Sequence, residues 1–446
     1  MSHPRGVLAL IGATLIDGNG GAPIANSVVV ITGNTIAAVG PASKVTIPDG
    51  ANVIRAHGKT LLPGLIDAHI HLGASGGGAA DPAEFTHETV AANLKTFLAF
   101  GVTSIMDMGA NPHLREQKAA LASGEVLGPR LFGVKYGITA PGSHPRGLLK
   151  RFRLESTQGP FTPVVDTVEE ARAIIRTVAD DRTDGVKIYH TRSEFPGNMC
   201  LDADKEKLKL EVLKVLVDEA HARGLRVFAH IAFPSEAREV VEAGVDVLAH
   251  PITHAESGAE EVLRLMAERN VSMHSTIVRV ESYYGLKVDP FGLERLRGKV
   301  SNVILDSITK PGSVARLRHE MPGVTEDARR IKEITMANVR RALKAGIRIV
   351  LGTDSGAPGA VHGASVPREL ELLNEAGLTP MQALSAATKN AAYVIGQGDV
   401  LGTVEAGKLA DLVVVGDNPL TDIPKMRNVE LVVKDGAVIE PRSLAF

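Results

Sequence analysis

Six polar side chains lie at the ends of short apolar runs that are far apart in the chain. The first two, His69 and His71, close the run LLPGLIDAHIH. The others close the runs DGVKIY, RVFAHI, VDVLAHP and IRIVLGTDSG, and they are Lys187, His230, His250 and Asp354. Imidazoles and carboxylates bind divalent metals, and a catalytic metal keeps one position open for water. The pattern therefore indicates a metal centre that activates water.

The spacing of these residues supports a shared centre. His69 and His71 are two residues apart on an extended segment, so their side chains point the same way. His230 and His250 end successive apolar runs and would be neighbours if those runs are adjacent parallel strands. Asp354 offers an oxygen ligand and a base toward metal-bound water.

Lys187 is the unusual member of the set, because an ammonium group cannot bind a cation. A buried lysine with a lowered pKa can react with CO2, and the resulting carbamate can bridge two metals as a carboxylate would. Two metals that share a hydroxide provide a nucleophile near neutral pH and polarise the attacked carbonyl. The alternative is a lysine paired with a carboxylate beside a single metal.

The elements that would position these residues alternate between strand and helix patterns over residues 61–400, which is typical of βαβ units. We expect eight strands, at residues 61–68, 101–109, 129–139, 185–189, 226–230, 245–250, 271–277 and 348–355. Eight parallel strands predict a (β/α)8 TIM barrel, in which catalytic groups collect where the carboxyl ends of the strands converge.

Both ends of the chain are rich in short strands instead. Residues 7–57 contain the turn Gly33-Asn34, and the segment after Gly407 contains the turn Asp435-Gly436. Short strands on both sides of an α/β body predict a small composite β-sandwich domain. We therefore divide the chain into an N-terminal part of that domain (1–60), the barrel (61–400) and the C-terminal part (401–446).

Composition restricts the class of protein. A net charge of −2 argues against nucleic acid as the main partner, and no apolar run reaches the roughly 18 residues of a membrane span. The single cysteine, Cys200, suits a reducing compartment. We expect a cytoplasmic homo-oligomer that acts on a small-molecule or dipeptide substrate, although a secretion signal that has been removed would leave no trace here.

At this point the motifs resemble a known group. HIH after LLPGLIDA, with Lys, His, His and Asp following in order, resembles the amidohydrolase superfamily of metal-dependent hydrolases. The tail LGTVEAGKLADLVVVGDNPLTDI is similar to the segment that leads those enzymes back into their small β domain. The resemblance implies two divalent ions, expected to be zinc, with the following ligands: His69, His71 and Asp354 for one ion, His230 and His250 for the other, and Lys187, carboxylated by CO2 to N6-carboxylysine, between them.

Within the superfamily, VKIY and GITAPGSHPRG are most similar to the branch of Xaa-Pro dipeptidases, carboxypeptidase-like enzymes and ochratoxin-type amidases. His144 matches the histidine of a GGH-like segment in that branch, although this chain has GSH followed by Pro145. Four residues are candidates for substrate binding: His144, Tyr189, His190 and His274. Each could instead be structural, as a solvated loop histidine, a rim tyrosine or a buried histidine. His254, His362 and Arg279 are weaker candidates.

These features predict an enzyme that cleaves an amide or peptide bond by attack of a metal-bridging hydroxide. Asp354 would take the hydroxide proton and deliver it to the leaving nitrogen. A dipeptidase or N-acyl amino-acid amidase is the first interpretation; a cyclic-amide hydrolase, or a lactonase or esterase, is the alternative. A deaminase is less favoured, because that branch typically uses one metal and a glutamate close after the fifth strand, whereas the first glutamate after His230 is Glu236. A non-catalytic assembly protein is disfavoured by the intact ligand set.

Two further features bear on the substrate. The long connections Ala140–Asp166 and Glu281–Thr325 would lie at the catalytic face as lids or substrate loops, and the second contains Tyr283 and Tyr284. The expected rim of the pocket offers several cationic or hydrogen-bonding side chains, which suit a carboxylate on the leaving side of the scissile amide: His144, Tyr189, His190, Arg279, Tyr283 and Tyr284. The segment GASGG matches a serine-hydrolase elbow, but its glycines continue, so we do not expect Ser75 to be a nucleophile.

Overall fold

The structure is a computed structural model. It describes residues 6–72, 86–109, 111–151, 155–156, 159–192, 206–283, 296–309, 324–357, 359–444 and 446. Three residues named above, Ser75, Cys200 and Tyr284, lie outside these ranges.

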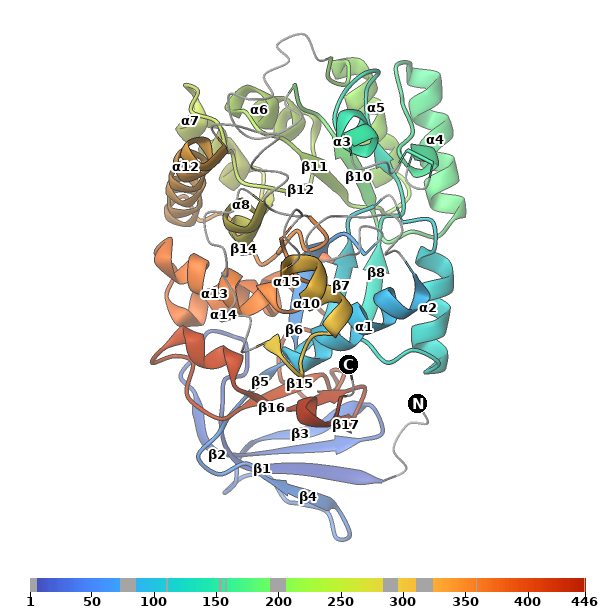
Figure 1. The fold of residues 1–446 in the computed structure, drawn as a ribbon. Coiled ribbons are helices and arrows are strands. Elements are labelled where there is room, and N and C mark those ends of the chain that lie inside the picture. Colours follow the sequence, from blue (N-terminus) through green and yellow to red (C-terminus); the bar gives the residue numbers. More distant parts are fainter. Residues whose placement is uncertain are drawn as a thin grey trace.

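Parallel strands form the interior of the α/β part (Figure 1). One sheet has three strands in the order β6-β7-β8, and the other has six in the order β14-β13-β12-β11-β10-β9. The strands are β6 (Leu65–Ile70), β7 (Val102–Asp107), β8 (Arg130–Gly133), β9 (Gly137–Ile138), β10 (Val186–Tyr189), β11 (Val227–His230), β12 (Val247–Leu248), β13 (Ser272–His274) and β14 (Ile349–Val350). Nearly every residue in them is buried, as expected for strands covered on both faces.

The two parallel sheets meet on both sides. The amide of Ala68 in β6 donates to the carbonyl of Leu351 just after β14 (3.1 Å), and the amide of Asp354 donates to the carbonyl of His69 (2.7 Å). On the other side β8 leads directly into β9, and the amide of Asp184 donates to the carbonyl of Gly133 (2.9 Å). The carboxyl ends of the first and last parallel strands therefore lie side by side.

Helices surround these strands (Figure 1). They are α1 (His87–Ala99), α2 (Leu114–Ser123), α3 (Arg146–Arg151), α4 (Val168–Asp180), α5 (Leu210–His221), α6 (Pro234–Ala243), α7 (Ala259–Glu268), α8 (Ile277–Tyr283), α10 (Asn302–Thr309), α12 (Val324–Lys344), α13 (Ser365–Glu375), α14 (Pro380–Ala386) and α15 (Lys389–Val394), with the 3-10 turns η2 (Gly159–Phe161), η4 (Ile423–Arg427) and η5 (Pro441–Ser443). Helix α4 illustrates why such segments are helical and pack on the strands. Thr167 and Glu170 form a capping box at its start, and Ala171, Ile175 and Val178 bury one of its faces. No helix in these ranges is long and apolar enough to cross a membrane.

Strands from both ends of the chain build one eight-stranded sheet, in the order β17-β16-β15-β5-β1-β2-β3 with β4 paired to β1. Figure 1 shows the first strands of the chain beside the last. Its strands are β1 (Val7–Leu15), β2 (Ile24–Thr32), β3 (Thr35–Pro41), β4 (Asn52–Arg55), β5 (Thr60–Pro63), β15 (Leu412–Val415), β16 (Val429–Lys434) and β17 (Ala437–Ile439). The predicted turns at Gly33-Asn34 and Asp435-Gly436 join β2 to β3 and β16 to β17.

Two predicted strands are divided. The predicted strand 61–68 is two strands that separate at Gly64: β5 pairs with β1 and β15, whereas β6 pairs with β7. Residues 60–63 therefore belong to the sheet of both termini rather than to the parallel strands. The predicted strand 129–139 is divided into β8 and β9 around Lys135, whose φ of 56° lies in the left-handed region. The three-part division of the chain stays a prediction.

Gly64 lies at a close approach between the two kinds of sheet. A Cβ at this position would stand 2.1 Å from Oγ1 and 2.9 Å from Cβ of Thr103, a buried β-branched residue that cannot swing away.

We therefore expect Gly64→Ala to lower the free energy of unfolding by about 1–3 kcal/mol, as overpacking does. Urea unfolding measures the change. Gly21→Ala is the control, because a Cβ there meets nothing within 4 Å. Equal stabilities for the two variants would contradict this account of Gly64.

Candidate metal centre

Three predicted ligands come together at the carboxyl ends of the parallel strands. His69 lies on β6, His250 follows β12 and Asp354 follows β14. All three are buried, and each has a nitrogen or oxygen ligand atom within 4.8 Å of the others'. Nε2 of His69 is 3.4 Å from Oδ1 of Asp354. This group has the donor atoms and spacing that a divalent metal uses.

His71 extends the group toward solvent. Its Nε2 is 3.2 Å from the same Asp354 oxygen, and its side chain is 22% exposed. The rings of His69 and His71 lie with their centroids 5.4 Å apart, so the two imidazoles share a target as their spacing predicts.

His230 lies on the far side of His250. Its ring centroid is 4.6 Å from that of His250, and it stacks on His144 at 4.5 Å. His230 is thus adjacent to the group of His69, His250 and Asp354 but is not one of its three members.

Three of these histidines, His69, His230 and His250, are held in the neutral form that binds metals. Burial, followed by the positive charge of Lys187 and of neighbouring histidines, keeps the pKa of His69 well below its ordinary value. The pKa values of His230 and His250 are lowered well below the ordinary value too, by burial first and then by nearby His144 and Arg279 respectively.

Lys187 lies on β10 and is completely buried. Its Nζ has no hydrogen-bond partner in the described part of the chain. Burial lowers its pKa to about 7, against which the charge of Asp354 acts. A buried amine without a partner is costly, and native structures seldom retain one without a reason. The neutral amine is also the form that reacts with CO2.

The carboxylate of Asp354 contacts both His71 and Arg279. Burial raises its pKa, but a hydrogen bond from His71 and the charge of Arg279 outweigh burial and bring the pKa to about 2. Nε of Arg279 lies 3.2 Å from Oδ2 of Asp354. The backbone of Asp354 has a φ of 55°, a conformation that is uncommon outside glycine and often marks functional positions.

Other groups orient the ligands from behind. His274 Nδ1 lies 3.2 Å from His69 Nδ1, and Thr276 Oγ1 lies 3.0 Å from His250 Nδ1. With the Nδ1 atoms of these two ligands engaged, their Nε2 atoms are left to face the centre. His274, which the sequence offered as a substrate contact, therefore lies where it can orient a ligand. His362 contacts the backbone instead: its Nε2 lies 3.2 Å from the carbonyl oxygen of His71.

The carboxylate of Asp67 joins the two strands that carry these residues. It accepts hydrogen bonds from the amide of Thr353 (3.0 Å), from the hydroxyl of Thr353 (2.6 Å) and from the amide of His69 (3.4 Å). Burial raises its pKa to about 7. Asp67 thus fixes β6 against the segment that carries Asp354.

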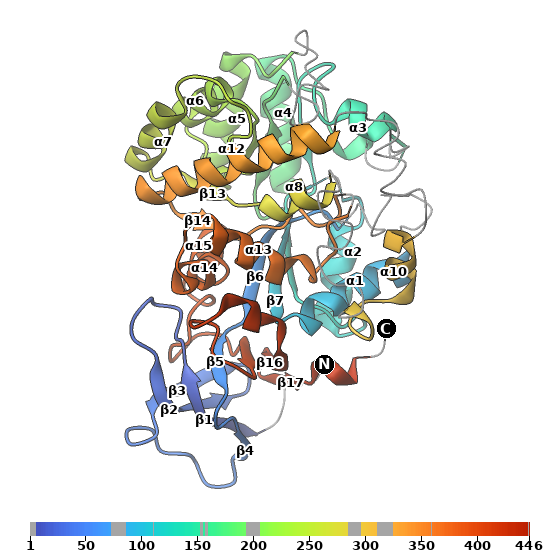
Figure 2. The same ribbon diagram turned by 60° about the vertical axis from the view of Figure 1, so that its left-hand side comes forward.

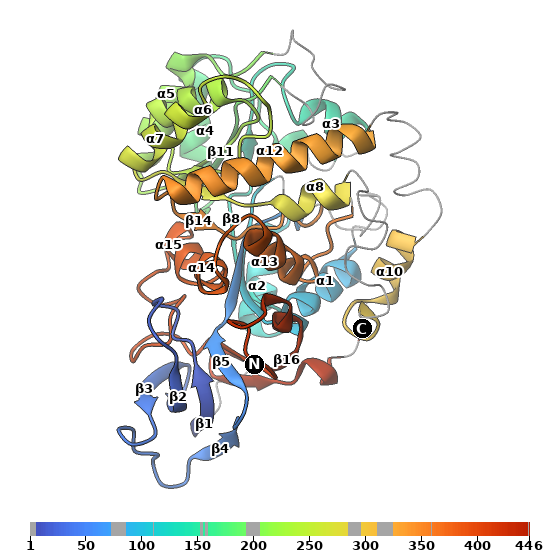
Figure 3. The ribbon, with the colours of Figure 1, turned by 90° about the vertical axis from the view of Figure 1, so that its left-hand side faces the viewer.

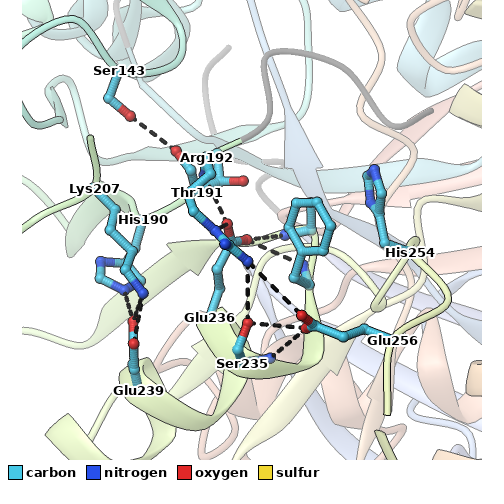
Figure 4. Close-up of polar contacts among 12 residues, drawn as sticks. Ser143, His190, Thr191, Arg192, Lys207, Ser235, Glu236, Glu239, His254 and Glu256 are labelled. Atoms are coloured by element: carbon cyan, nitrogen blue, oxygen red, sulfur yellow. Dashed lines mark hydrogen bonds and ion pairs between the residues drawn. The ribbon is translucent and has the colours of Figure 1, made fainter. Parts of the chain in front are cut away.

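The remaining candidates divide into two groups. His144 and Tyr189 lie beside His230, with the Tyr189 ring centroid 5.1 Å from that of His144. His190 faces another way: its Nε2 lies 2.7 Å from Glu239, which also pairs with Lys207 (Figure 4). The structure therefore places His144 and Tyr189 at the centre and His190 in a separate ion-paired cluster.

Glu236, the first glutamate after His230, is part of the structural framework nearby. Its fully buried carboxylate accepts hydrogen bonds from the amides of Arg192, Ala232 and Phe233 (Figure 4). These bonds fix the loop after β11 rather than present the carboxylate to the ligand group.

Sequence reasoning missed Asp67 and Thr276 and gave Arg279 little weight. Asp67 had a signal, since it lies two residues before His69 on the same strand and alternation places it on the same face. Thr276 and Arg279 follow a short strand in no regular pattern, so only the folded chain shows where they point.

The chain is similar in sequence to known proteins. The model of the Amidohydrolase family matches residues 60–439. Ochratoxinase of Aspergillus niger is 27% identical over 448 residues, covering 93% of this chain and 82% of its own length. Imidazolonepropionase of Geobacillus kaustophilus is 28% identical over 443 residues, covering 93% of this chain and 90% of its own length.

Solved structures share the fold. A Xaa-Pro dipeptidase with methionine bound in its active site superposes with a TM-score of 0.77 at 24% identity, over 97% of this chain and 100% of the other. A prolidase in complex with N-methylphosphonate-L-proline gives a TM-score of 0.77 at 25% identity, over 97% and 99%.

The lowered pKa of Lys187 predicts a pH-dependent stability. Between the folded-state pKa of about 7 and the ordinary lysine pKa of 10.5, the unfolded chain keeps a proton on this amine that the folded protein has lost. The free energy of unfolding of wild-type protein free of metal and CO2 should therefore rise with pH in this window, because of Lys187, by up to about 1.4 kcal/mol per pH unit.

Lys187→Met should abolish this contribution, so the stability of the variant relative to wild type should fall as pH rises from 7 to 10. Urea unfolding at several pH values measures it. Lys44→Met, at an exposed lysine, is the control. A difference that stays constant with pH would mean that Lys187 keeps an ordinary pKa.

Proposed function

Because the chain belongs to the amidohydrolase family and is a hydrolase that acts on C–N bonds, we propose that it is a two-metal dipeptidase or N-acyl amino-acid amidase. The observation that carries this proposal is the buried amine of Lys187, which has no hydrogen-bond partner among the described residues and interacts through its charge with His69, His250 and Asp354.

For the fold, we infer a closed (β/α)8 barrel capped by a β-sandwich. Support comes from the hydrogen bonds that join β6 to the segment after β14 and β8 to the segment before β10. In such a barrel the catalytic groups gather at the carboxyl ends of the strands, which is where the described ligands lie.

The residues fit the metals that this family implies. His69, His71 and Asp354 would hold one ion, and His230 and His250 the other, with Lys187 as a carbamate between them. Neutral imidazoles and an ionised carboxylate are the required protonation states, and the shifted pKa values favour them. Carboxylation would also convert the Lys187 amine, which has no hydrogen-bond partner among the described residues, into an anionic group that can bind cations.

Two divalent ions would supply Lewis acidity and a water nucleophile at neutral pH. The chain's own contribution is to move a proton. Asp354 has a carboxylate that is ionised and buried beside the histidines, so it can accept the proton of the nucleophile and pass it to the leaving nitrogen. Arg279 and His71 keep that carboxylate in place.

The rim suits a substrate with a free carboxylate. Arg279 is a largely buried cation (14% exposed) that lies beside Asp354, while His144 and Tyr189 line the side next to His230. A carboxylate on the leaving side of the scissile amide could pair with such groups, and charge-assisted hydrogen bonds would orient it. The prolidase complex, whose ligand contains L-proline, is in keeping with this class.

A cyclic-amide hydrolase is the second candidate, and one observation favours it: the imidazolonepropionase relative is as similar to this chain as the ochratoxinase. A lactonase or esterase on the same centre is a variant of this candidate. The homo-oligomer stays a prediction.

The proton transfer assigned to Asp354 leads to a kinetic prediction. Asp354→Asn should lower kcat by about 10²–10⁴, the usual contribution of acid–base catalysis, while KM changes far less. Steady-state kinetics at fixed metal content measure both. Asp399→Asn, at an exposed site, is the control. A kcat within a few-fold of wild type would place the base elsewhere.

The carboxylate requirement tests the substrate class. We expect an N-acyl amino acid to be hydrolysed with a higher kcat/KM than the same compound with a C-terminal amide, because only the acid can pair with Arg279. The comparison uses zinc-loaded protein and both compounds. Equal or faster cleavage of the amide would reject this class and favour the cyclic-amide candidate.

A further inference from the structure

Arg279 reaches the centre from a helix that needs outside support. Helix α8 has seven residues, and a helix of this length is not stable by itself in water. Figures 2 and 3 show it lying between α12 and α13. The contacts with those two helices must therefore fix where Arg279 points.

Glu369 of α13 binds the first turn of α8. Its Oε1 accepts a hydrogen bond from the amide of Ile277 (2.9 Å), and its Oε2 accepts one from the amide of Val278 (2.6 Å). These are amides that a helix cannot pair within its own first turn. Glu369 is completely buried, so water does not compete for these bonds.

Arg368, the neighbour of Glu369, binds the other end of the same helix. Its Nε and Nη2 each lie 2.9 Å from an oxygen of Glu281, a fork-like pair that is almost fully buried. Lys332 of α12 adds a second cation to Glu281 at 2.5 Å. Two consecutive residues of α13 therefore hold α8 on both sides of Arg279.

The outcome of this bracing is the placement of one guanidinium. Arg279 lies between the two ties, and its Nε is 3.2 Å from Oδ2 of Asp354. We propose that Glu369 is a positioning residue that acts through α8 to hold Arg279 where it can meet the carboxylate of the substrate. The role of Arg279 rests on the proposed function; the bracing of α8 does not.

Hydrogen exchange tests the bracing without any substrate. In Glu369→Gln, one carboxylate oxygen is replaced by an NH2 group that cannot accept, so one of the two amides, Ile277 or Val278, loses its acceptor and should exchange faster than in wild type. Glu375→Gln is the matched control, because Glu375 also lies on α13 and pairs with Arg368 but makes no bond to α8. Unchanged exchange in Glu369→Gln would overturn the proposal. If that variant does not fold, Glu369→Asp, which shortens the side chain but keeps its charge, replaces it.

A double-mutant cycle with Arg279→Met tests the connection to the site. Each single variant should lower kcat/KM for an N-acyl amino acid about ten-fold to a hundred-fold, through KM because the substrate carboxylate loses its partner and through kcat because Asp354 loses the contact with Arg279. The double variant should be no worse than Arg279→Met alone. Multiplied effects would show that Glu369 does not act through Arg279. So would a lower melting temperature of Glu369→Gln with a wild-type KM.

The proposed function can fail separately from this inference. If wild-type protein cleaves the C-terminal amide as well as the acid, the carboxylate preference is wrong. The exchange measurement, and the same cycle on whichever compound is cleaved, then still decide whether Glu369 positions Arg279.

Discussion

The hydrogen bonds between β6 and the segment after β14 are the constraint on which the site depends. They bring His69 and Asp354, from opposite ends of the α/β part, into one group. Asp67 strengthens the same junction by binding Thr353 through both its amide and its hydroxyl. If the first and last parallel strands did not meet, His69 and His71 would not face the carboxylate of Asp354. The geometry of the junction is therefore also the geometry of the centre.

Around this junction the protein concentrates groups that are unfavourable in a buried interior. Lys187 has a buried amine without a described partner, and the buried imidazoles have strongly lowered pKa values. A core built for stability alone would contain apolar side chains here. Perturbed groups that converge at the strand ends are instead typical of active sites. The same buried amine and imidazoles that lower the stability of the fold would therefore supply its catalytic groups.

Much of this could be predicted from the sequence, and the reason is physical. The predicted ligands Lys187 and His230 end short apolar runs, so the strand pattern alone gives their positions at one edge. The split of residues 61–68 at Gly64 could not be predicted, since LLPGLI is continuously apolar. The residues that Gly64 meets lie far along the chain: it packs against the side chain of Thr103, and its amide donates a hydrogen bond to the carbonyl of Asp411. The different environments of Tyr189 and His190 follow the alternation of an extended chain. Glu369 could not be recognised, because a glutamate in a helix usually faces water, and its contact with α8 arises only from the packing of α13.

We propose that Lys187 joins two metal ions in one centre. The zinc content per chain of protein prepared with zinc and bicarbonate, measured together with activity on the same sample, tests this proposal. Close to two zinc ions per chain are expected in the active protein. Full activity at one zinc ion per chain, unchanged by added zinc, would contradict it.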